Sequence, residues 1–208
     1  MKVYEYKGAP NPARVRIALA EKGLFDAVEF VQVDLPGGAH RQPAFLAKNP
    51  SGALPVLELD DGTCISECTA ITEFLDQSAG EPELTGRTAR ERALIHMMQR
   101  KVESGLMEAL AAYFHQATPG LGPALEGEQN KAWGERQLGV ARATLRWLDG
   151  VLAERPYLAG ERFTVADITL MGALHFARLA GQSLPPELAN VQAWHNRVQA
   201  RPSAALAA

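Results

Sequence analysis

The fold of this chain can be predicted from one segment of its first half, Asn49-Pro50-Ser51-Gly52-Ala53-Leu54-Pro55-Val56-Leu57-Glu58-Leu59. Its last four residues alternate loosely after a run of turn-forming residues, which is typical of a short strand. Pro55 stands just before this strand, where a proline fits because it cannot donate a hydrogen bond within a sheet. X–Pro bonds are cis in about 5–6% of cases in folded proteins, and the bend predicted here favours that conformation at Leu54–Pro55.

The residues that follow predict a hairpin and then a helix. Asp60-Asp61-Gly62 is a tight-turn signal, Thr63-Cys64-Ile65 forms a second strand, and a helical pattern begins at Glu67. A bend, a hairpin and a helix start in so short a run place backbone N–H and C=O groups around one small cleft.

The segment from Asn49 to Cys68 resembles the glutathione-binding half of the cytosolic glutathione S-transferases, and the resemblance extends through the whole chain. It implies an α/β thioredoxin-like domain (βαβ–α–ββ–α, with a cis-proline) and an all-α helical bundle after it. We expect the first domain over residues 1–80, a linker over 81–87 and the helical domain over 88–208. In the first domain we expect strands over residues 2–6, 28–33, 56–59 and 63–65, and helices over 12–22, 44–47 and 67–79.

The resemblance also implies which residues hold glutathione. In the family, the peptide before the cis-proline pairs its backbone with the cysteinyl part of glutathione, and this assigns Leu54 and Pro55. A Glu–Ser pair at the next helix start holds the γ-glutamyl end, and the matching pair here is Glu67 and Cys68. Glu67 has an alternative reading as a first-turn acid that complements the helix dipole. The Cys68 thiol is a poor donor compared with a hydroxyl, but its backbone N–H can hold a carboxylate.

Two basic residues are candidates for the glycyl carboxylate of glutathione. His40 falls where some classes of the family use a histidine, and Lys48 is a second cation near that end. The alternative for His40 is a solvated loop histidine.

The chemistry of the family requires a glutathione thiolate near neutral pH. A free thiol has a pKa of about 8.5, and each unit by which the pKa is lowered corresponds to about 1.36 kcal/mol. Lowering it by two units therefore needs about 3 kcal/mol, which one helix N-terminus and one or two hydrogen bonds can supply. The helix expected to begin at Asn11-Pro12 supplies the first contribution.

The donor to the thiolate has two candidates. Serine-type members carry a hydroxyl where this chain has Ala9, which has nothing to donate. The run Ala9-Pro10-Asn11 is similar to the Thr-Pro-Asn motif of bacterial theta- or nu-like members, so Asn11 is the first candidate; its alternative is an ordinary helix N-cap. Tyr6 is the second, by analogy with tyrosine-type classes, and its alternative is a core or sheet-face tyrosine.

The pattern after the linker is helical. We expect helices over residues 89–116 and 126–153, a third beginning at Thr164 and a fourth opening at Pro185-Pro186, with the turn-forming run 118–123 ending the first. Thr164 and Asp167 form a capping box, and Phe163 with Ile168 forms a hydrophobic staple. Replacing Asp167 by alanine should cost about 1 kcal/mol or more of stability.

The resemblance implies a second substrate and a partner. An apolar electrophile would lie between the domains against Met107, Leu110, Ala111, Tyr113 and Phe114, although most such residues belong to protein cores. Family members are two-fold dimers, so we expect a homodimer with Arg92, Arg100 and Glu103 at its interface.

Composition excludes several other classes. The net charge of −3 and the pI near 6.0 leave no basic surface for nucleic acid, and no apolar run is long enough to span a membrane. The first residues form a strand, which argues against a signal peptide. Cys64 and Cys68 make no disulfide framework, which favours the cytoplasm. His96, His115, His175 and His195 lack the spacing of metal ligands, so we expect no metal.

We therefore expect a cytoplasmic detoxification enzyme, a glutathione transferase with glutathione as co-substrate. Two alternatives stay open. One is glutathione-dependent reduction of disulfides or peroxides, which suits an asparagine site without a hydroxyl. The other is a non-catalytic module that binds glutathione or another protein, suggested by Ala9.

Overall fold

A computed structural model describes residues 1–119 and 126–206. These residues form two compact units, one of residues 1–87 with the segment from Arg201 onward, and one of residues 88–200. The linker over 81–87 stays a prediction. The turn run predicted over 118–123 lies largely outside the described residues.

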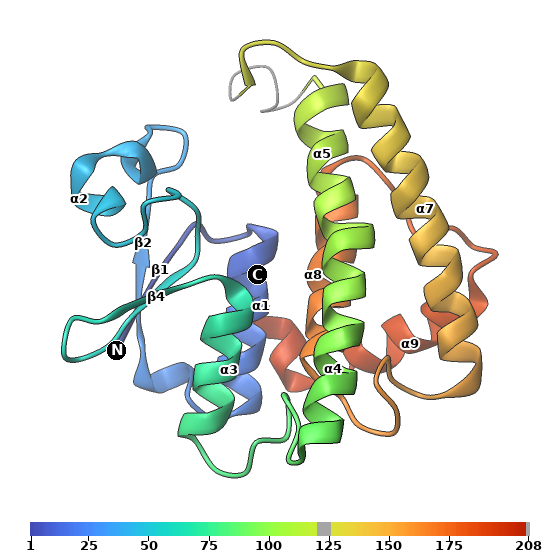
Figure 1. Cartoon of the computed structure of the whole chain (residues 1–208), viewed down its shortest axis with the longest axis horizontal. Coiled ribbons are helices and arrows are strands. Elements are labelled where there is room, and N and C mark those ends of the chain that lie inside the picture. Colours follow the sequence, from blue (N-terminus) through green and yellow to red (C-terminus); the bar gives the residue numbers. More distant parts are fainter. Residues whose placement is uncertain (120–125, 207–208) are drawn as a thin grey trace. The chain divides into compact units, whose positions relative to one another are not determined.

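The first unit is built on a mixed four-stranded sheet, as predicted (Figure 1). Its strands are β1 (Lys2–Glu5), β2 (Glu29–Gln32), β3 (Val56–Glu58) and β4 (Cys64–Ser66), in the order β2-β1-β3-β4. β1 and β2 are parallel, whereas β3 runs antiparallel to both of its neighbours. The crossover between the parallel strands and the hairpin between β3 and β4 are those that the sequence indicated.

Helices cover both faces of this sheet (Figure 1). α1 (Pro10–Glu21) and α3 (Cys68–Ser78) pack together on one face, and the short α2 (Pro43–Leu46) lies on the other. On the α2 side, Phe45 packs with Val33 and Val56, and Leu54 adds to this cluster. The residue before the predicted cis-proline is therefore anchored in apolar packing.

The start of α1 differs from the prediction. Asn11 was expected to cap this helix, but the helix begins at Pro10 and Ala9 is its N-cap. Proline has no N–H and a φ close to that of a helix, so Pro10 and Pro12 both fit the first turn, where an N–H has no intrahelical partner. Gly8, with a φ of +85°, lets the chain turn into the helix. Asn11 therefore lies inside the first turn, and the N-cap alternative for its side chain is wrong.

Residues 201–206 belong to the first compact unit, whereas the helical domain was predicted to extend over residues 88–208. The guanidinium of Arg201 donates two hydrogen bonds to Glu21 of α1, at 2.8 and 2.6 Å. Arg16 Nε donates to the carbonyl of Leu206 at 2.8 Å. These contacts join residues 180 and 190 positions apart, so local patterns could not predict them.

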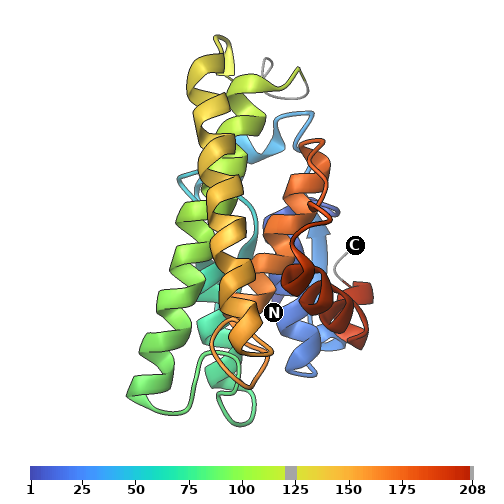
Figure 2. The same ribbon diagram turned by 90° about the vertical axis from the view of Figure 1, so that its right-hand side faces the viewer.

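The second unit is all helical. It contains α4 (Ala89–Val102), the π-helical turn η3 (Glu103–Met107), α5 (Glu108–Ala117), α7 (Lys131–Glu154), α8 (Val165–Leu179) and α9 (Ala189–Gln199). α4, η3 and α5 follow one another as a single rod with α7 alongside α5 (Figure 2). This agrees with the single helix expected over 89–116, apart from the π-helical turn. Asn130 caps α7 by accepting from the Trp133 N–H at 3.0 Å, so α7 starts later than predicted.

The capping box at the start of α8 is confirmed. Asp167 accepts from the backbone N–H of Thr164 at 3.0 Å and from its hydroxyl at 3.1 Å. It also accepts from the Leu158 N–H at 3.0 Å and from the indole N–H of Trp194 at 2.9 Å. One buried carboxylate thus joins the preceding loop, α8 and α9.

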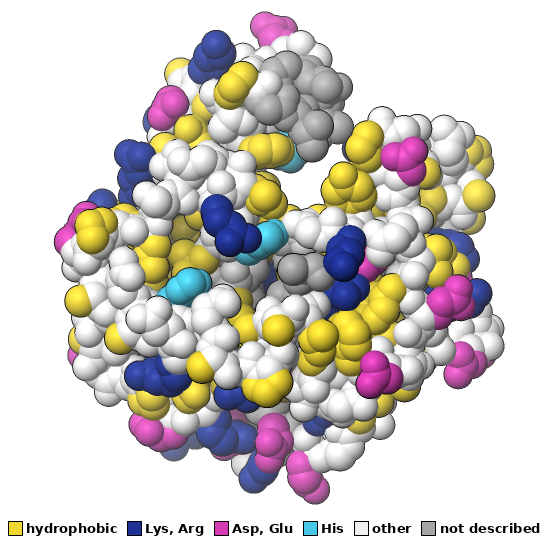
Figure 3. Space-filling model, turned by 180° about the vertical axis from the view of Figure 1, so that it is seen from behind, with side chains coloured by type: hydrophobic (Ala, Val, Ile, Leu, Met, Phe, Trp, Pro, Cys, Tyr) yellow, Lys and Arg dark blue, Asp and Glu magenta, His cyan; other side chains and the backbone are white. Residues whose placement is uncertain are grey.

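Basic and acidic side chains lie intermixed on the face seen in Figure 3. In the part of the chain that the structure describes, no helix is both long and apolar enough to cross a bilayer.

Candidate active site

The N-terminal ends of α1 and α3 meet at Asn11 and Cys68. The Cys68 thiol donates to the backbone carbonyl of Asn11, with a sulfur–oxygen distance of 3.4 Å. Each helix carries a partial positive charge at its N-terminus, which attracts anions. The first unit therefore brings two such ends together beside the residues that the sequence singled out for a thiolate and a carboxylate.

Asn11 is exposed and carries the donors of the first turn of α1. Of residues 10 to 12 only Asn11 has a backbone N–H, and the Ala13 N–H already bonds the Ala9 carbonyl at 3.2 Å. The Asn11 side-chain oxygen Oδ1 accepts from Arg14 Nη1 at 3.2 Å. Asn11 is therefore the residue of this first turn whose backbone N–H is left for a ligand.

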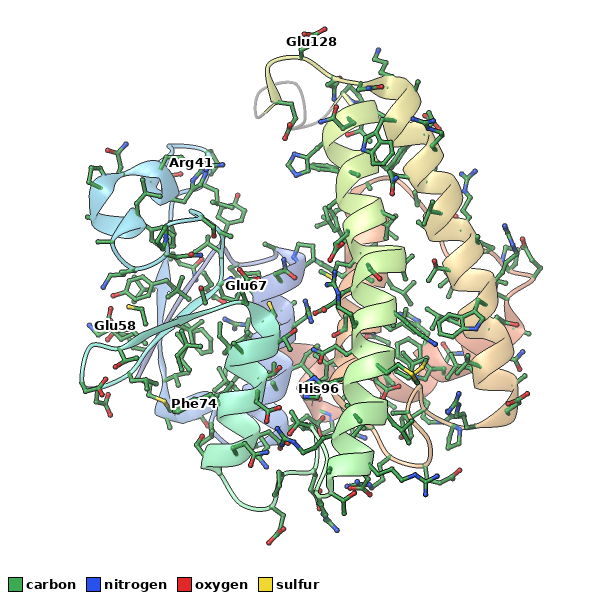
Figure 4. All side chains as sticks on the ribbon, viewed as in Figure 1. Arg41, Glu58, Glu67, Phe74, His96 and Glu128 are labelled. Atoms are coloured by element: carbon green, nitrogen blue, oxygen red, sulfur yellow. The ribbon has the colours of Figure 1, made fainter. Side chains whose placement is uncertain are left out.

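Glu67 lies at the N-terminal end of α3 (Figure 4). It is the N-cap residue, with φ 69° and ψ 123°, and its carbonyl accepts the Ile71 N–H at 2.9 Å. Non-glycine residues rarely adopt a positive φ, and such residues cluster at functional sites. Glu67 therefore stands one residue before the first turn of α3, a position from which a carboxylate still complements the helix dipole.

The Leu54–Pro55 peptide bond is cis, as expected. In the β3–β4 ladder Val56 pairs with Ser66, so Pro55 and Glu67 occupy the next opposed positions. The peptide expected to pair with the cysteinyl backbone is therefore next to the start of α3.

A buried asparagine shapes the loop that leads into this peptide. Asn49 Nδ2 donates to the Ala53 carbonyl at 2.8 Å, and Asn49 Oδ1 accepts from the Ser51 hydroxyl at 3.0 Å. Gly52 takes a φ of +66°, and a Cβ there would stand 3.1 Å from the carbonyl oxygen of His40. The loop is thus held against the segment that carries His40.

His40 is only 8% exposed, so the alternative of a solvated loop histidine is wrong. Burial, with a contribution from the charge of Arg41, lowers the pKa of the His40 imidazole. The lowered pKa favours the neutral form of His40 at pH 7. Its Nδ1 is buried and has no hydrogen-bond partner among residues 1–119 and 126–206.

Arg41 supplies positive charge beside His40 and is not among the residues predicted from the sequence. Its Nη1 lies 3.3 Å from where a Cβ at Gly52 would be, and its side chain is exposed (Figure 4). The signal available in the sequence was its place next to His40.

Lys48, the cation predicted near the glycyl end of glutathione, is already paired with another residue. Its ammonium bonds the carboxylate of Glu58 on β3 and lies 4.8 Å from the centre of the Tyr4 ring. The hydrogen bond with Glu58 raises the pKa of Lys48 to about 12. A charge already neutralised in this way is less available to a ligand than that of Arg41.

Tyr6 lies beyond the end of β1 and is 39% exposed, so the alternative of a core or sheet-face tyrosine is wrong. Its carbonyl accepts the Ala9 N–H at 3.1 Å, which closes the turn before α1.

The five apolar residues expected to line the second-substrate pocket separate into two groups. Met107 and Leu110 are buried in the core of the helical unit. Ala111, Tyr113 and Phe114 are half-buried on α5, where Phe114 packs on Phe176 with ring centres 5.6 Å apart. Only the second group has surface to offer an apolar ligand.

Within the described part of the chain, no group of three or more His, Cys, Asp or Glu residues is placed to hold a metal ion.

Comparison with known proteins gives the family. Models of the N-terminal and C-terminal domains of glutathione S-transferases match residues 3–83 and 131–197. "Glutathione S-transferase 2" of Saccharomyces cerevisiae is 51% identical over 203 residues, which are 98% of this chain and 87% of that protein.

Solved structures agree. Gtt2 from Saccharomyces cerevisiae has a TM-score of 0.96 and 50% identity, with all of both chains covered. A glutathione S-transferase domain-containing protein from Marinobacter aquaeolei has a TM-score of 0.94 and 57% identity, covering 98% of this chain and 99% of that one. These matches extend over nearly the whole length, and this chain belongs to the glutathione S-transferase family.

Proposed function

We propose that this transferase binds glutathione at the joined N-termini of α1 and α3 and transfers its thiolate to an apolar electrophile. The observation that carries the proposal is the contact between Cys68 and Asn11 beside the cis Leu54–Pro55 peptide. It brings two positive helix ends and an extended backbone edge to the same place.

Each part of the tripeptide has residues suited to it. The backbone at Leu54 and Pro55 pairs with the cysteinyl residue, and Glu67 with the N–H of Cys68 binds the γ-glutamyl end. At the glycyl end, neutral His40 offers a hydrogen bond and Arg41 a charge. Lys48 has a lesser part there because Glu58 already neutralises it.

Asn11 stabilises the thiolate. Its backbone N–H and side-chain amide are two donors at a helix N-terminus, which together can supply the roughly 3 kcal/mol needed to lower a thiol pKa by two units. Tyr6 remains the second candidate, because it is 39% exposed.

The apolar electrophile lies against Ala111, Tyr113 and Phe114, whose partial exposure supports this role. Met107 and Leu110 support those residues from the core.

Reduction of disulfides or peroxides with glutathione is the second candidate reaction. Ala9 has no hydroxyl, and this favours reduction. The Asn11 amide can donate a hydrogen bond to the thiolate, but it has no acidic proton to give to it. Parallel assays with an aryl halide and a mixed disulfide distinguish the two reactions.

A cytoplasmic homodimer is the expected state of the enzyme. Leu94 and Met97 on α4 and Trp147 on α7 are large apolar side chains at least 40% exposed, and the Lys101 ammonium lies 5.1 Å from the centre of the Trp147 ring. Large exposed apolar side chains of this kind support an interface on these helices. Light scattering of the purified protein tests it: a monomer at micromolar concentration contradicts the dimer.

Glutathione binding and the activation of its thiol are tested by two successive measurements. Calorimetric titration with glutathione measures binding, and thiolate absorbance against pH then gives the pKa of the bound thiol. We expect this pKa to lie well below 8.5 in the wild type and to rise in Asn11→Ala. Asn196→Ala, an exposed asparagine on α9, serves as the matched control. A bound thiol with a pKa near 8.5 in the wild-type protein would refute catalysis.

A further inference from the structure

We propose that Arg14 is a positioning residue: it holds the side-chain amide of Asn11 so that the NH2 group faces the sulfur of bound glutathione. The inference rests on the proposed function and adds to it a residue that does not itself touch the substrate.

The observation is the hydrogen bond from Arg14 Nη1 to Asn11 Oδ1, at 3.2 Å. The two residues are three positions apart on α1, so their side chains lie on the same side of the helix. Arg14 is only 4% exposed although it carries a full charge. Its guanidinium is therefore fixed by its surroundings and can hold another group in place.

The chemistry of the two side chains decides which way the amide faces. A guanidinium carries five N–H donors and no acceptor. The Asn11 atom that meets it must therefore be the carbonyl oxygen, and the NH2 group is turned away from Arg14. Because Asn11 is exposed, that NH2 group can be reached by a ligand from solvent. A donor with a fixed direction is thus left at the N-terminus of α1.

The backbone of Asn11 is held as well. Its carbonyl accepts the Cys68 thiol at 3.4 Å, which ties the first turn of α1 to the start of α3. With main chain and side chain both restrained, Asn11 loses little conformational freedom when it binds a thiolate. Preorganisation of this kind is what makes a single donor effective at an anion.

The predicted consequence is a shift in the pKa of bound glutathione. Replacing Arg14 by methionine removes the donors and keeps the chain length, so the Asn11 amide can rotate. We expect the pKa of the bound thiol to rise by about 0.5 to 1 unit, the effect of one weakened hydrogen bond. Arg14→Lys keeps a side chain that can only donate, so it should restore most of the shift.

A double-mutant cycle shows whether Arg14 acts through Asn11. The thiol pKa is measured in wild type, Arg14→Met, Asn11→Ala and the double variant, each saturated with glutathione. If Arg14 acts through Asn11, adding Arg14→Met to Asn11→Ala changes the pKa by less than about 0.3 unit. Equal shifts in both backgrounds, or no shift in the wild-type background, overturn the inference.

An NMR spectrum of the wild-type protein tests the inference even if Arg14→Met does not fold. The side-chain NH2 signals of Asn11 are assigned by their absence in Asn11→Ala, and glutathione is then added. Movement of these signals supports the inference. Signals that stay in place while calorimetry reports binding overturn it together with the role of the Asn11 side chain, and leave glutathione binding itself intact. Loss of binding by the wild-type protein in calorimetry would instead overturn the proposed function.

Discussion

Replacing Asp167 by alanine should destabilise the protein far more than the loss of a helix cap does. Asp167 is fully buried and accepts from the N–H groups of Leu158, Thr164 and Trp194, which are buried too. Three unsatisfied buried donors cost about 1–3 kcal/mol each. Part of this is returned, because burial raises the pKa of Asp167 to about 6, which means that the ionised carboxylate is disfavoured by about 3 kcal/mol. At about 2 kcal/mol per donor the three donors cost about 6 kcal/mol, so we expect a net loss of about 3 kcal/mol, above the minimum of about 1 kcal/mol expected from the sequence.

The assay is urea unfolding followed by tryptophan fluorescence, with Thr88→Ala as the matched control. Thr88 caps α4 by accepting the Glu91 N–H at 3.2 Å on the exposed surface, so its loss should cost about 1 kcal/mol. If Asp167→Ala costs no more than Thr88→Ala, the network around Asp167 does not stabilise the protein and the reasoning is wrong.

The pH dependence of the same pair of proteins gives a second test. The pKa of Asp167 is about 6 in the folded protein and near 3.8 when unfolded, so between these values the folded state binds more protons. The contribution of Asp167 to stability is therefore full below about pH 4 and decreases as the pH rises to about 6. The stability difference between wild type and Asp167→Ala should be larger at pH 4 than at pH 7, and a smaller difference at pH 4 would contradict this.

Three further predictions concern other parts of the molecule. Asp76→Ala should cost about 3 kcal/mol of stability at pH 7 and less at pH 3. Burial raises the pKa of Asp76, but hydrogen bonds from its neighbours outweigh this and lower it, so the contribution of Asp76 to stability is lost as the pH falls. An equal cost at both pH values in urea unfolding would contradict this. Gly134→Ala should lower the free energy of unfolding by about 1–3 kcal/mol, since its new Cβ would lie 2.7 Å from a neighbouring Cβ. Gly139→Ala, with open space on the same helix, should raise it by about 0.5–1 kcal/mol. Equal melting temperatures of the two variants would refute the close packing at Gly134. Arg41→Ala should raise the Kd for glutathione about three- to tenfold and Lys48→Ala less than about twofold, and calorimetry that gives the reverse order would restore the original choice of Lys48.

Local patterns were sufficient for the elements that depend on neighbouring residues. The strand after Pro55, the hairpin turn and the capping box of Thr164 and Asp167 were all predicted, because their signals act within four or five positions. The start of α1 was misplaced by two residues, since two prolines in one turn gave competing signals.

The candidate site was predictable in part. The order of elements and the run from Leu54 to Cys68 indicated which residues meet, and a resemblance to a family gave their roles. Which cation stands near His40 could not be read in this way, because Lys48 is neutralised by Glu58 across the fold, and the contact of Arg41 with Gly52 depends on the path of a loop.

The sequence by itself determined the helices, the strands and the proline junction, because short-range sterics and hydrogen bonding govern them. Only the tertiary structure decided that Cys68 meets Asn11, that Trp194 joins the network of Asp167, and that the last described residues lie against α1. These contacts join residues from 27 to 180 positions apart. Burial and charge pairing select them after the chain has folded, and no periodic pattern in the sequence records them.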